Sequence, residues 1–190
     1  MSYFPALINL EDKKVLIVGG GKIASDKLEK LLHFTKDITV IAKEFSPKIL
    51  ELSKIHCLST LPRAYRSGDI DGFDIVVVAV DSLTIQERIY NEAKDKKILV
   101  NSVDEKRFCD FLFPSFVKKG DLIVSFSTSG SSPALSRELR RYFQRVIPDS
   151  IEEFLQEMKR LRATLPKGKE RMEFFREMAK EFMKSNFKDK

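Results

Sequence analysis

The sequence predicts an α/β fold: a Rossmann-like parallel sheet, then a small α+β segment and a helical C-terminal tail. Three observations indicate this fold. Up to about residue 113, short apolar segments alternate with amphipathic segments of helical length. The first apolar segment runs directly into a glycine-rich turn. From Phe111 onwards, two strand-like segments follow one another without a helix between them, and helical periodicity then continues towards the end of the chain.

The first part of the chain is expected to form five strands, at residues 15–18, 38–41, 56–58, 73–80 and 98–103. Helices are expected between them, at residues 23–34, from Ser46 onwards and from Ser82 to about Lys96. Ser46 is followed by proline, which is a typical start of a helix. Strands that are apolar throughout and joined by helices form parallel sheets covered on both faces. We therefore expect strand order 3-2-1-4-5, as in a Rossmann fold.

The second part is expected to begin with two strands, at residues 111–115 and 122–127, which a turn at 118–121 joins. A helix then runs from Ser132 to about Val146, with apolar residues on one face and four arginines largely on the other. Two further amphipathic helices are expected within residues 149–187. Domain boundaries are therefore predicted near residues 113 and 147.

Composition and charge limit the classes of function. The chain has 190 residues and no apolar run of the roughly 18 residues that a membrane span needs. Its start lacks the features of a signal peptide, and Cys57 and Cys109 are single and widely separated, so we expect a cytoplasmic protein without membrane contact. Residues 106–145 hold eight Lys/Arg and three Asp/Glu, a net charge of +5. No nucleic-acid motif accompanies this charge, which suits a small polyanionic substrate and predicts no nucleic-acid partner.

A dinucleotide-binding turn is predicted at the end of the first strand. Gly19-x-Gly21-x-x-Ala24 has the spacing of the dinucleotide fingerprint. Gly19 permits the tight turn, and Gly21 lets the backbone approach a pyrophosphate. The small residue Ala24 lets the helix pack closely, so that its first amides face the phosphates. Because this turn follows a strand and precedes a helix, we favour a cofactor site over a turn with a structural role alone.

The residues after the second strand leave the type of cofactor open. An acidic residue is expected there to bind the ribose hydroxyls, but the strand ends in Lys43-Glu44. Glu44 is the candidate for the ribose, displaced by a residue or two, whereas Lys43 suits the 2′-phosphate of NADP. A solvated loop is the alternative for both residues.

Asp104 is the candidate catalytic residue. It lies just beyond the fifth strand, at the edge where open α/β sheets bind their ligands. A carboxylate at that place can act as a general base or hold a substrate in register. The alternative is that Asp104 caps the short helical turn that follows it.

A hydroxyl-rich loop precedes the arginine-bearing helix and is the candidate substrate site. Its side chains are those of Thr128, Ser129, Ser131 and Ser132, and Arg137 follows in the helix. Such a loop at the start of a helix suits carboxylates or phosphate. The alternative is a capped turn. His33 and His56 show no metal-ligand spacing, so no metal site is predicted.

Together these motifs resemble the precorrin-2 dehydrogenase/sirohydrochlorin ferrochelatase family, which is also the N-terminal module of bifunctional siroheme synthases. The matching pieces follow the family's order over most of residues 1–145. They are Phe4-Pro5, residues 18–27 with their glycines, Asn101-Ser102-Val103-Asp104, Phe113-Pro114-Ser115, and residues 127–137.

The resemblance implies oxidation of precorrin-2 to sirohydrochlorin with NAD, followed in many members by insertion of ferrous iron to give siroheme. It implies a homodimer with an NAD-binding Rossmann domain at residues 1–113, a central dimerisation and substrate domain at 114–147, and a helical domain at 148–190. The carboxylates of the tetrapyrrole are opposite in charge to the basic segment at residues 106–145.

By position, the resemblance also assigns roles to residues. Lys22, Ile23, Lys43 and Glu44 match positions that contact the cofactor. Asp104 matches the family's essential aspartate. Thr128 lies where some relatives have a serine in the substrate pocket. A histidine that functions in some relatives has no counterpart in residues 116–120, which weakens the case for iron insertion more than that for dehydrogenation.

Three alternatives remain at this point. The first is dehydrogenation alone, with a separate chelatase. The second is a regulatory module that binds NAD(P) without catalysis, although such a module has no need of the hydroxyl-rich loop and arginine helix. The third is a basic nucleic-acid-binding protein, which a steep salt dependence of duplex binding would support.

Overall fold

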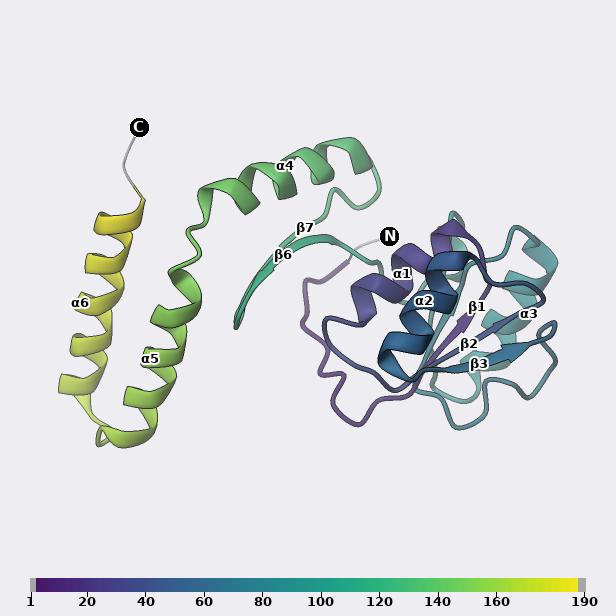
Figure 1. The fold of residues 1–190 in the computed structure, drawn as a ribbon, viewed down its shortest axis with the longest axis horizontal. Coiled ribbons are helices and arrows are strands. Elements are labelled where there is room, and N and C mark those ends of the chain that lie inside the picture. The colour runs from purple at the N-terminus through teal and green to yellow at the C-terminus, as the bar shows by residue number, and fades with distance from the viewer. Residues whose placement is uncertain (1–2, 188–190) are drawn as a thin grey trace. The chain divides into compact units, whose positions relative to one another are not determined.

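A computed structural model describes residues 3–187 of the chain. The chain divides into two compact units, Met1–Phe113 and Pro114–Lys190. Each unit is described by itself below. Their elements are labelled in Figure 1.

The first unit is a five-stranded parallel sheet with helices on both faces. Its strands are β1 (Val15–Val18), β2 (Ile38–Ala42), β3 (Ser59–Pro62), β4 (Ile75–Val78) and β5 (Leu99–Ser102). Its helices are α1 (Lys22–Leu31), α2 (Pro47–His56) and α3 (Leu83–Lys94). The strand order β3-β2-β1-β4-β5 confirms the predicted Rossmann-like topology. In the register, Val15 of β1 lies opposite Ile38 of β2 and Ile75 of β4.

Two hydrophobic clusters hold the helices to the sheet. Successive side chains of a strand point to opposite faces, so β1 contributes to both clusters. Ile17 packs with Leu28 of α1 and Ile49 of α2 on one face. Leu16 packs with Ile89 of α3 on the other. All four residues of β1 are buried, and the end of this central strand is therefore fixed from both sides.

Two expected strands lie elsewhere in the structure. The third strand was expected at residues 56–58, but α2 continues to His56 and ends at Cys57, whose φ of 56° is left-handed, so β3 begins only at Ser59. The strand expected at residues 111–115 begins at Ser115 as β6. Phe111 and Phe113 instead pack against the core of the first unit, because their rings cover apolar surface beside α1.

The second unit begins with a two-stranded antiparallel sheet, β6 (Ser115–Lys119) and β7 (Leu122–Phe126). Three helices follow: α4 (Pro133–Val146), α5 (Ile151–Thr164) and α6 (Lys169–Asn186). The sheet, α4, α5 and α6 share one small core around Val117, Ile147 and Ile151. Across the α5–α6 hairpin, the rings of Phe154 and Phe182 stack with their centroids 4.3 Å apart.

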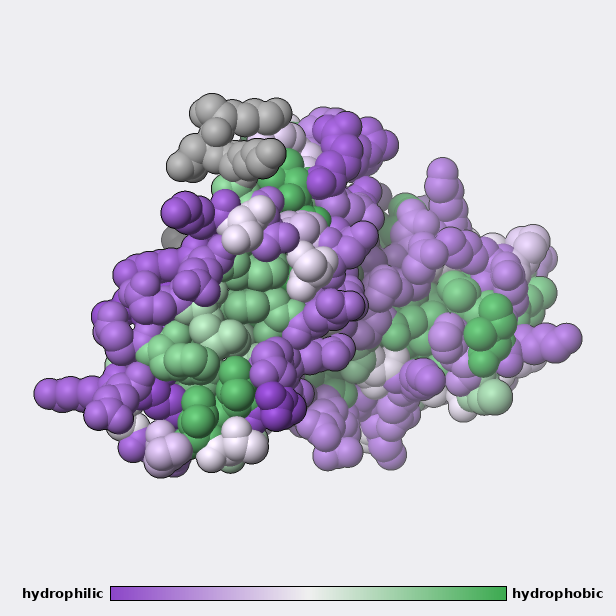
Figure 2. Space-filling model, turned by 60° about the vertical axis from the view of Figure 1, so that its left-hand side comes forward, coloured by the Kyte–Doolittle hydropathy of each residue, from purple (hydrophilic) through white to green (hydrophobic). Residues whose placement is uncertain are grey.

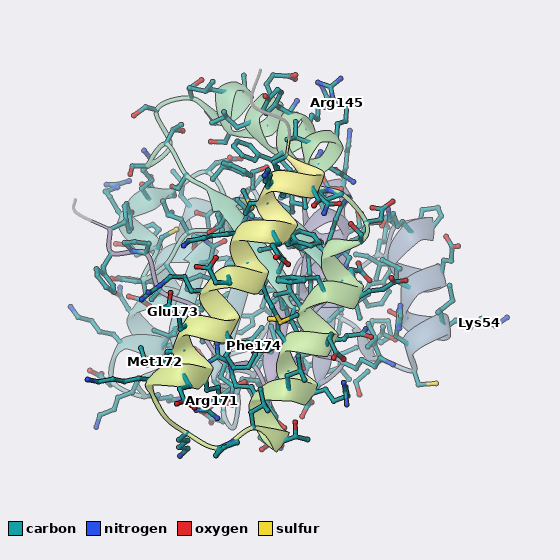
Figure 3. All side chains as sticks on the ribbon, turned by 90° about the vertical axis from the view of Figure 1, so that its left-hand side faces the viewer. Lys54, Arg145, Arg171, Met172, Glu173 and Phe174 are labelled. Carbon is teal, nitrogen blue, oxygen red and sulfur yellow. The ribbon has the colours of Figure 1, made fainter. Side chains whose placement is uncertain are left out.

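The second unit also exposes apolar side chains. Figure 2 shows a band of them on its α5–α6 side, with polar side chains along the flanks. Figure 3 looks onto these helices, where Met172 and Phe174 lie near the start of α6. Met172 is 66% exposed. Within residues 3–187, none of the helices has the length and apolar character that crossing a membrane requires.

Candidate functional site

The turn between β1 and α1 is fixed against both neighbouring strands. Gly19 N–H donates to the carbonyl oxygen of Ile41 at 2.8 Å, and Ala79 N–H donates to that of Val18 at 2.7 Å. Gly19 has φ of 129°, a conformation that only glycine adopts readily. A Cβ atom there would also collide with the carbonyl oxygen of Ala79. The fold itself therefore requires glycine at position 19.

The fold also requires Gly20, which the fingerprint spacing passes over. Its carbonyl oxygen accepts a hydrogen bond from Ser46 N–H at 2.8 Å. A Cβ atom on Gly20 would collide with the carbonyl oxygen of Glu44 and lie 2.8 Å from the Ala42 side chain. The glycine turn thus lies directly against the loop that follows β2.

Gly21 differs from its neighbours because the protein leaves space around it. It is the N-cap of α1, with φ of −85°, and nothing lies within 4 Å of the place where a Cβ would stand. No side chain caps the first turn of α1, so its amides remain available to a ligand. An open glycine before exposed helix amides fits the pyrophosphate of a dinucleotide.

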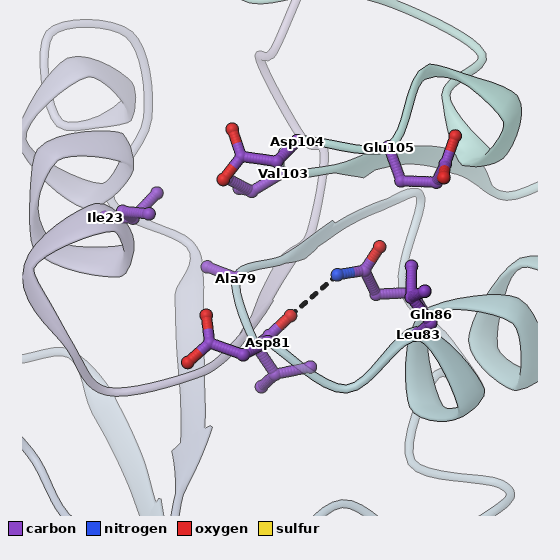
Figure 4. A pocket seen from close by; sticks show the side chains of 9 residues that line it. Ile23, Ala79, Asp81, Leu83, Gln86, Val103, Asp104 and Glu105 are labelled. Atoms are coloured by element: carbon purple, nitrogen blue, oxygen red, sulfur yellow. Dashed lines mark hydrogen bonds between the residues drawn. The ribbon is translucent and has the colours of Figure 1, made fainter.

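A hollow of about 160 Å³ lies beside this turn, at the carboxyl edge of the sheet (Figure 4). Ile23 of α1 and Asp104 face the same opening from different sides. The loop after β4 contributes Ala79, Val80 and Asp81, and Gln86 of α3 donates to the Val80 carbonyl oxygen at 2.7 Å. The remaining lining residues are Leu83, Val103 and Glu105. The structure therefore brings together the predicted cofactor residue Ile23 and the predicted catalytic residue Asp104.

Asp104 occupies an uncommon backbone conformation. Its φ is 65°, in the left-handed region that aspartate and asparagine tolerate better than most residues. Val103 N–H just before it donates to the Val78 carbonyl oxygen at 2.9 Å, which ties the loop to β4. The helical cap expected as an alternative is provided by Glu105 instead, whose side chain accepts from Arg107 N–H. Asp104 is exposed at the wall of the hollow.

The loop after β5 is held back against its own strand. Asn101 Nδ2 donates to the Phe111 carbonyl oxygen at 2.8 Å and lies 3.6 Å from Cys109 Sγ. Asp110 accepts from Val100 N–H through its carboxylate, and its own N–H donates to the Val100 carbonyl oxygen. Asn101 thus has a positioning role that its place in the resembling motif did not reveal.

Asp81 also lines the hollow, and sequence reasoning did not select it. Asp81 follows β4 just as Asp104 follows β5, so its place at a strand end was the available signal. Lys27, the last residue of the resembling glycine motif, lies further along α1. The ammonium of Lys27 lies 4.1 Å from the centroid of the Phe113 ring. Burial, and then the nearby Lys30, lower the pKa of Lys27 to about 8, while Cys109, Asp104 and Asp26 oppose this decrease.

Replacing Lys27 with methionine is expected to stabilise the protein at pH 7 by about 1–2 kcal/mol, because a half-buried ammonium loses hydration. The pKa of Lys27 is about 8 in the folded protein, against an ordinary value of 10.5 for an exposed lysine. Between pH 8 and pH 10.5 the unfolded chain therefore binds more protons than the folded one. Wild-type stability therefore rises relative to Lys27→Met across this window. Urea unfolding of both proteins at pH 7 and pH 10.5 measures the difference. A gap that does not change with pH would contradict the burial argument.

The other predicted cofactor residues lie at the same edge of the first unit. Lys22 begins α1 and is exposed, next to the glycine turn. Lys43 and Glu44 follow β2 and are exposed. The backbone of Glu44 lies against Gly20, so this loop borders the phosphate-binding turn directly.

The hydroxyl-rich loop belongs to the second unit, where its hydroxyl oxygens organise the start of α4. Thr128 Oγ1 accepts from Ser132 N–H at 3.0 Å, and Ser132 Oγ accepts from Leu135 N–H as the N-cap. Ser129 has φ of 51°. Ser131 and Arg137 are exposed. The loop is therefore a capped turn. A meeting of this loop with Asp104 remains a prediction.

Within residues 3–187, no group of three or more His, Cys, Asp or Glu side chains is arranged to hold a metal ion. The residues at the glycine turn do, by contrast, fit a nicotinamide dinucleotide. The open position at Gly21, the exposed amides of α1 and the adjoining hollow form a continuous edge of the first unit.

Comparisons with known proteins agree with this geometry. The chain is 32% identical to siroheme synthase 1 of Serratia proteamaculans over 80% of its length, and 31% identical to a siroheme synthase of Methylococcus capsulatus over 92%. It spans about a third of the length of these relatives, 32% and 38% respectively. A solved structure described as "SirC, precorrin-2 dehydrogenase" has the same fold, with a TM-score of 0.77 at 24% identity, covering 89% of this chain and 85% of that one.

A protein-family profile described as "Putative NAD(P)-binding" matches residues 6–115. This match covers more than half of the chain and includes the whole parallel sheet, the glycine turn and the Asp104 loop. The chain belongs to this NAD(P)-binding family.

Proposed function

We propose that this protein is an NAD-dependent dehydrogenase that oxidises precorrin-2 to sirohydrochlorin in siroheme biosynthesis. One observation carries the proposal: Asp104 and Ile23 line one hollow next to a glycine turn that suits a dinucleotide. The similarity to siroheme synthases and the fold of a precorrin-2 dehydrogenase support the choice of substrate.

The proposed reaction removes a hydride and a proton from the substrate. When bound, the nicotinamide ring supplies the hydride acceptor. Asp104 accepts the proton as a general base, from the wall of the same hollow. Its exposure gives a large substrate access to the carboxylate.

We assign the cofactor to the first unit and prefer NAD to NADP. The proposed contacts are those of Gly19, Gly21, Lys22, Ile23, Lys43 and Glu44. Glu44 supports NAD because its backbone adjoins the phosphate-binding turn, within reach of a ribose whose hydroxyls a carboxylate can accept from. Lys43, exposed beside Glu44 on the same loop, is the other proposed contact there.

We assign the substrate carboxylates to the hydroxyl-rich loop and Arg137. Thr128 Oγ1 accepts hydrogen bonds within the turn, so its own O–H proton remains to be donated to a ligand. The net charge of +5 over residues 106–145 favours a polyanionic substrate. The roles proposed for Ser129, Ser131 and Ser132 follow from the same loop.

We also propose a homodimer, with residues 114–147 as a dimerisation and substrate segment and residues 148–190 as a helical segment. The exposed apolar side chains of Leu135, Tyr142 and Val146 on α4 support an interface within residues 114–147. Sedimentation equilibrium tests this, and a mass of one chain at micromolar concentration would contradict it.

The test of function is an anaerobic assay with precorrin-2. We expect NADH and the spectrum of sirohydrochlorin to appear together with NAD⁺, and more slowly with NADP⁺. Cofactor binding without turnover would support the regulatory alternative and contradict the proposal. Sirohydrochlorin with ferrous iron, in the absence of NAD⁺, separately decides whether iron insertion is a second activity of this chain.

A further inference from the structure

Gln86 is the buried polar side chain in the lining of the hollow. It belongs to α3 and is only 4% exposed, whereas Asp81 and Asp104 in the same lining are exposed. Its Nε2 donates to the Val80 carbonyl oxygen at 2.7 Å. Among residues 3–187, no donor forms a hydrogen bond with its other amide atom, Oε1. Because buried acceptors rarely lack a donor, Oε1 is an acceptor available to a ligand in the hollow.

The backbone of the loop after β4 fixes the orientation of the Gln86 amide. A carbonyl oxygen only accepts hydrogen bonds, so the amide atom that faces Val80 is the nitrogen. Turning the amide over would place Oε1 against the Val80 carbonyl oxygen, with two acceptors facing each other. Figure 4 shows the amide end of Gln86 across the hollow from Ile23, with its oxygen turned away from the Val80 carbonyl. An acceptor therefore lies on the α3 side of the hollow.

The order of the strands relates this hollow to one half of a dinucleotide. The glycine turn at the end of β1 suits the pyrophosphate, and the loop after β2, with Glu44, borders that turn. β4 and β5 lie on the other side of β1 from β2, and the residues that follow them line the hollow. With the adenosine ribose assigned to the β2 loop, the nicotinamide half is assigned to the hollow.

The lining of the hollow matches the chemistry of an oxidised nicotinamide. Its carboxylates favour the positive charge of a pyridinium ring. The carboxamide on that ring carries an NH2 group, which is the kind of donor that Gln86 Oε1 lacks. Its apolar side chains suit the flat faces of the ring; they are those of Ile23, Ala79, Val80, Leu83 and Val103.

We propose that Gln86 recognises the carboxamide of the nicotinamide, with Oε1 accepting a hydrogen bond from its NH2 group. This inference rests on the proposed function and deepens it, because it adds a cofactor contact that selects the nicotinamide group itself. A buried, uncharged acceptor suits an uncharged donor, since burying a charge is costly. The ribose hydroxyls are the competing donors in this half of the cofactor, and the ligands of the test separate the two.

The test is calorimetric titration of wild type and Gln86→Met with three ligands. These are NAD⁺, its 3-acetylpyridine analogue, in which a methyl group replaces the carboxamide NH2, and ADP-ribose, which lacks the nicotinamide. Wild type should bind NAD⁺ about five- to tenfold more tightly than the analogue. Gln86→Met should lose this preference and bind both equally. Its affinity for ADP-ribose should stay within about twofold of wild type, because the glycine turn is unchanged.

Two further variants complete the comparison. Asn91→Met replaces an exposed amide on the same helix and should match wild type with every ligand. Gln86→Asn keeps the amide but shortens the side chain by one methylene group, so it should lose the same preference as Gln86→Met. It also replaces the methionine variant if that variant does not fold.

Two results would overturn the inference. Equal losses for NAD⁺ and the analogue in the Gln86 variants would mean that Gln86 contacts the ribose or supports the fold through Val80. Equal affinity of wild type for NAD⁺ and the analogue would give Oε1 another partner, such as water, and this result needs no variant. None of these titrations uses precorrin-2. If wild type shows the expected preference but does not oxidise precorrin-2, the proposed function fails and the inference stands.

Discussion

Asp104→Asn is expected to lower the turnover of precorrin-2 by about 10²–10⁴-fold, because an amide cannot accept the proton that a general base removes. NAD⁺ should still bind with nearly wild-type affinity, since the glycine turn and α1 are untouched. Asparagine is the most informative substitution because it removes the charge and little else. It has almost the same shape as aspartate and also tolerates the left-handed φ of 65° at this position. Stopped-flow measurement of NADH formation, alongside NAD⁺ titration, gives both quantities.

Two neighbouring carboxylates provide matched controls for this prediction. Asp81 and Glu105 line the same hollow, and each can be changed to its amide. Figure 4 shows the Glu105 carboxylate directed away from the opening that Asp104 faces. Asp81→Asn and Glu105→Gln should therefore lower kcat by less than about tenfold. Equal losses in all three variants would indicate a general effect of charge, and a parallel loss of NAD⁺ binding in Asp104→Asn would indicate a structural role.

The sequence was sufficient for the sheet because buried strands carry their own pattern. Val15–Val18 and β4 are apolar throughout, and β2 is apolar except for Thr39, so the order and direction of these strands could be predicted. The edge strand β3 lacks this apolar pattern, and its position was therefore predicted wrongly. Its residues are mostly exposed, and the end of α2 depends on the left-handed backbone of Cys57, which no periodicity reveals.

The sequence predicted only those site residues whose type and position in the chain together indicate a function. Glycines after a strand, and Asp104 at a strand end, fall in this class. The burial of Lys27 does not, because this residue of the resembling motif looks like an ordinary lysine of an amphipathic helix until the Phe113 ring is seen to lie against it. Asn101 likewise becomes a positioning residue only through its bond to Phe111, ten residues away.

Alanine at Gly20 and at Gly21 is expected to separate the two functions of the glycine turn. Gly20→Ala should destabilise the fold by about 1–3 kcal/mol, because its Cβ would collide with the Glu44 carbonyl oxygen and force the backbone apart. Gly21→Ala should cost less than about 1 kcal/mol, since the site is open and its φ of −85° suits alanine. Urea unfolding of the two variants measures this contrast.

NAD⁺ affinity, unlike stability, should be more sensitive to the substitution at Gly21. A methyl group at position 21 points into the space that a pyrophosphate needs, so Gly21→Ala should lower NAD⁺ affinity by about tenfold or more although the fold is intact. Calorimetric titration with NAD⁺ tests this. Unchanged affinity in a stably folded Gly21→Ala would place the phosphates elsewhere, and with them the nicotinamide. The hollow beside Ile23 and Asp104 would then lose its link to hydride transfer, since only a pyrophosphate held at this turn directs the rest of the cofactor towards it.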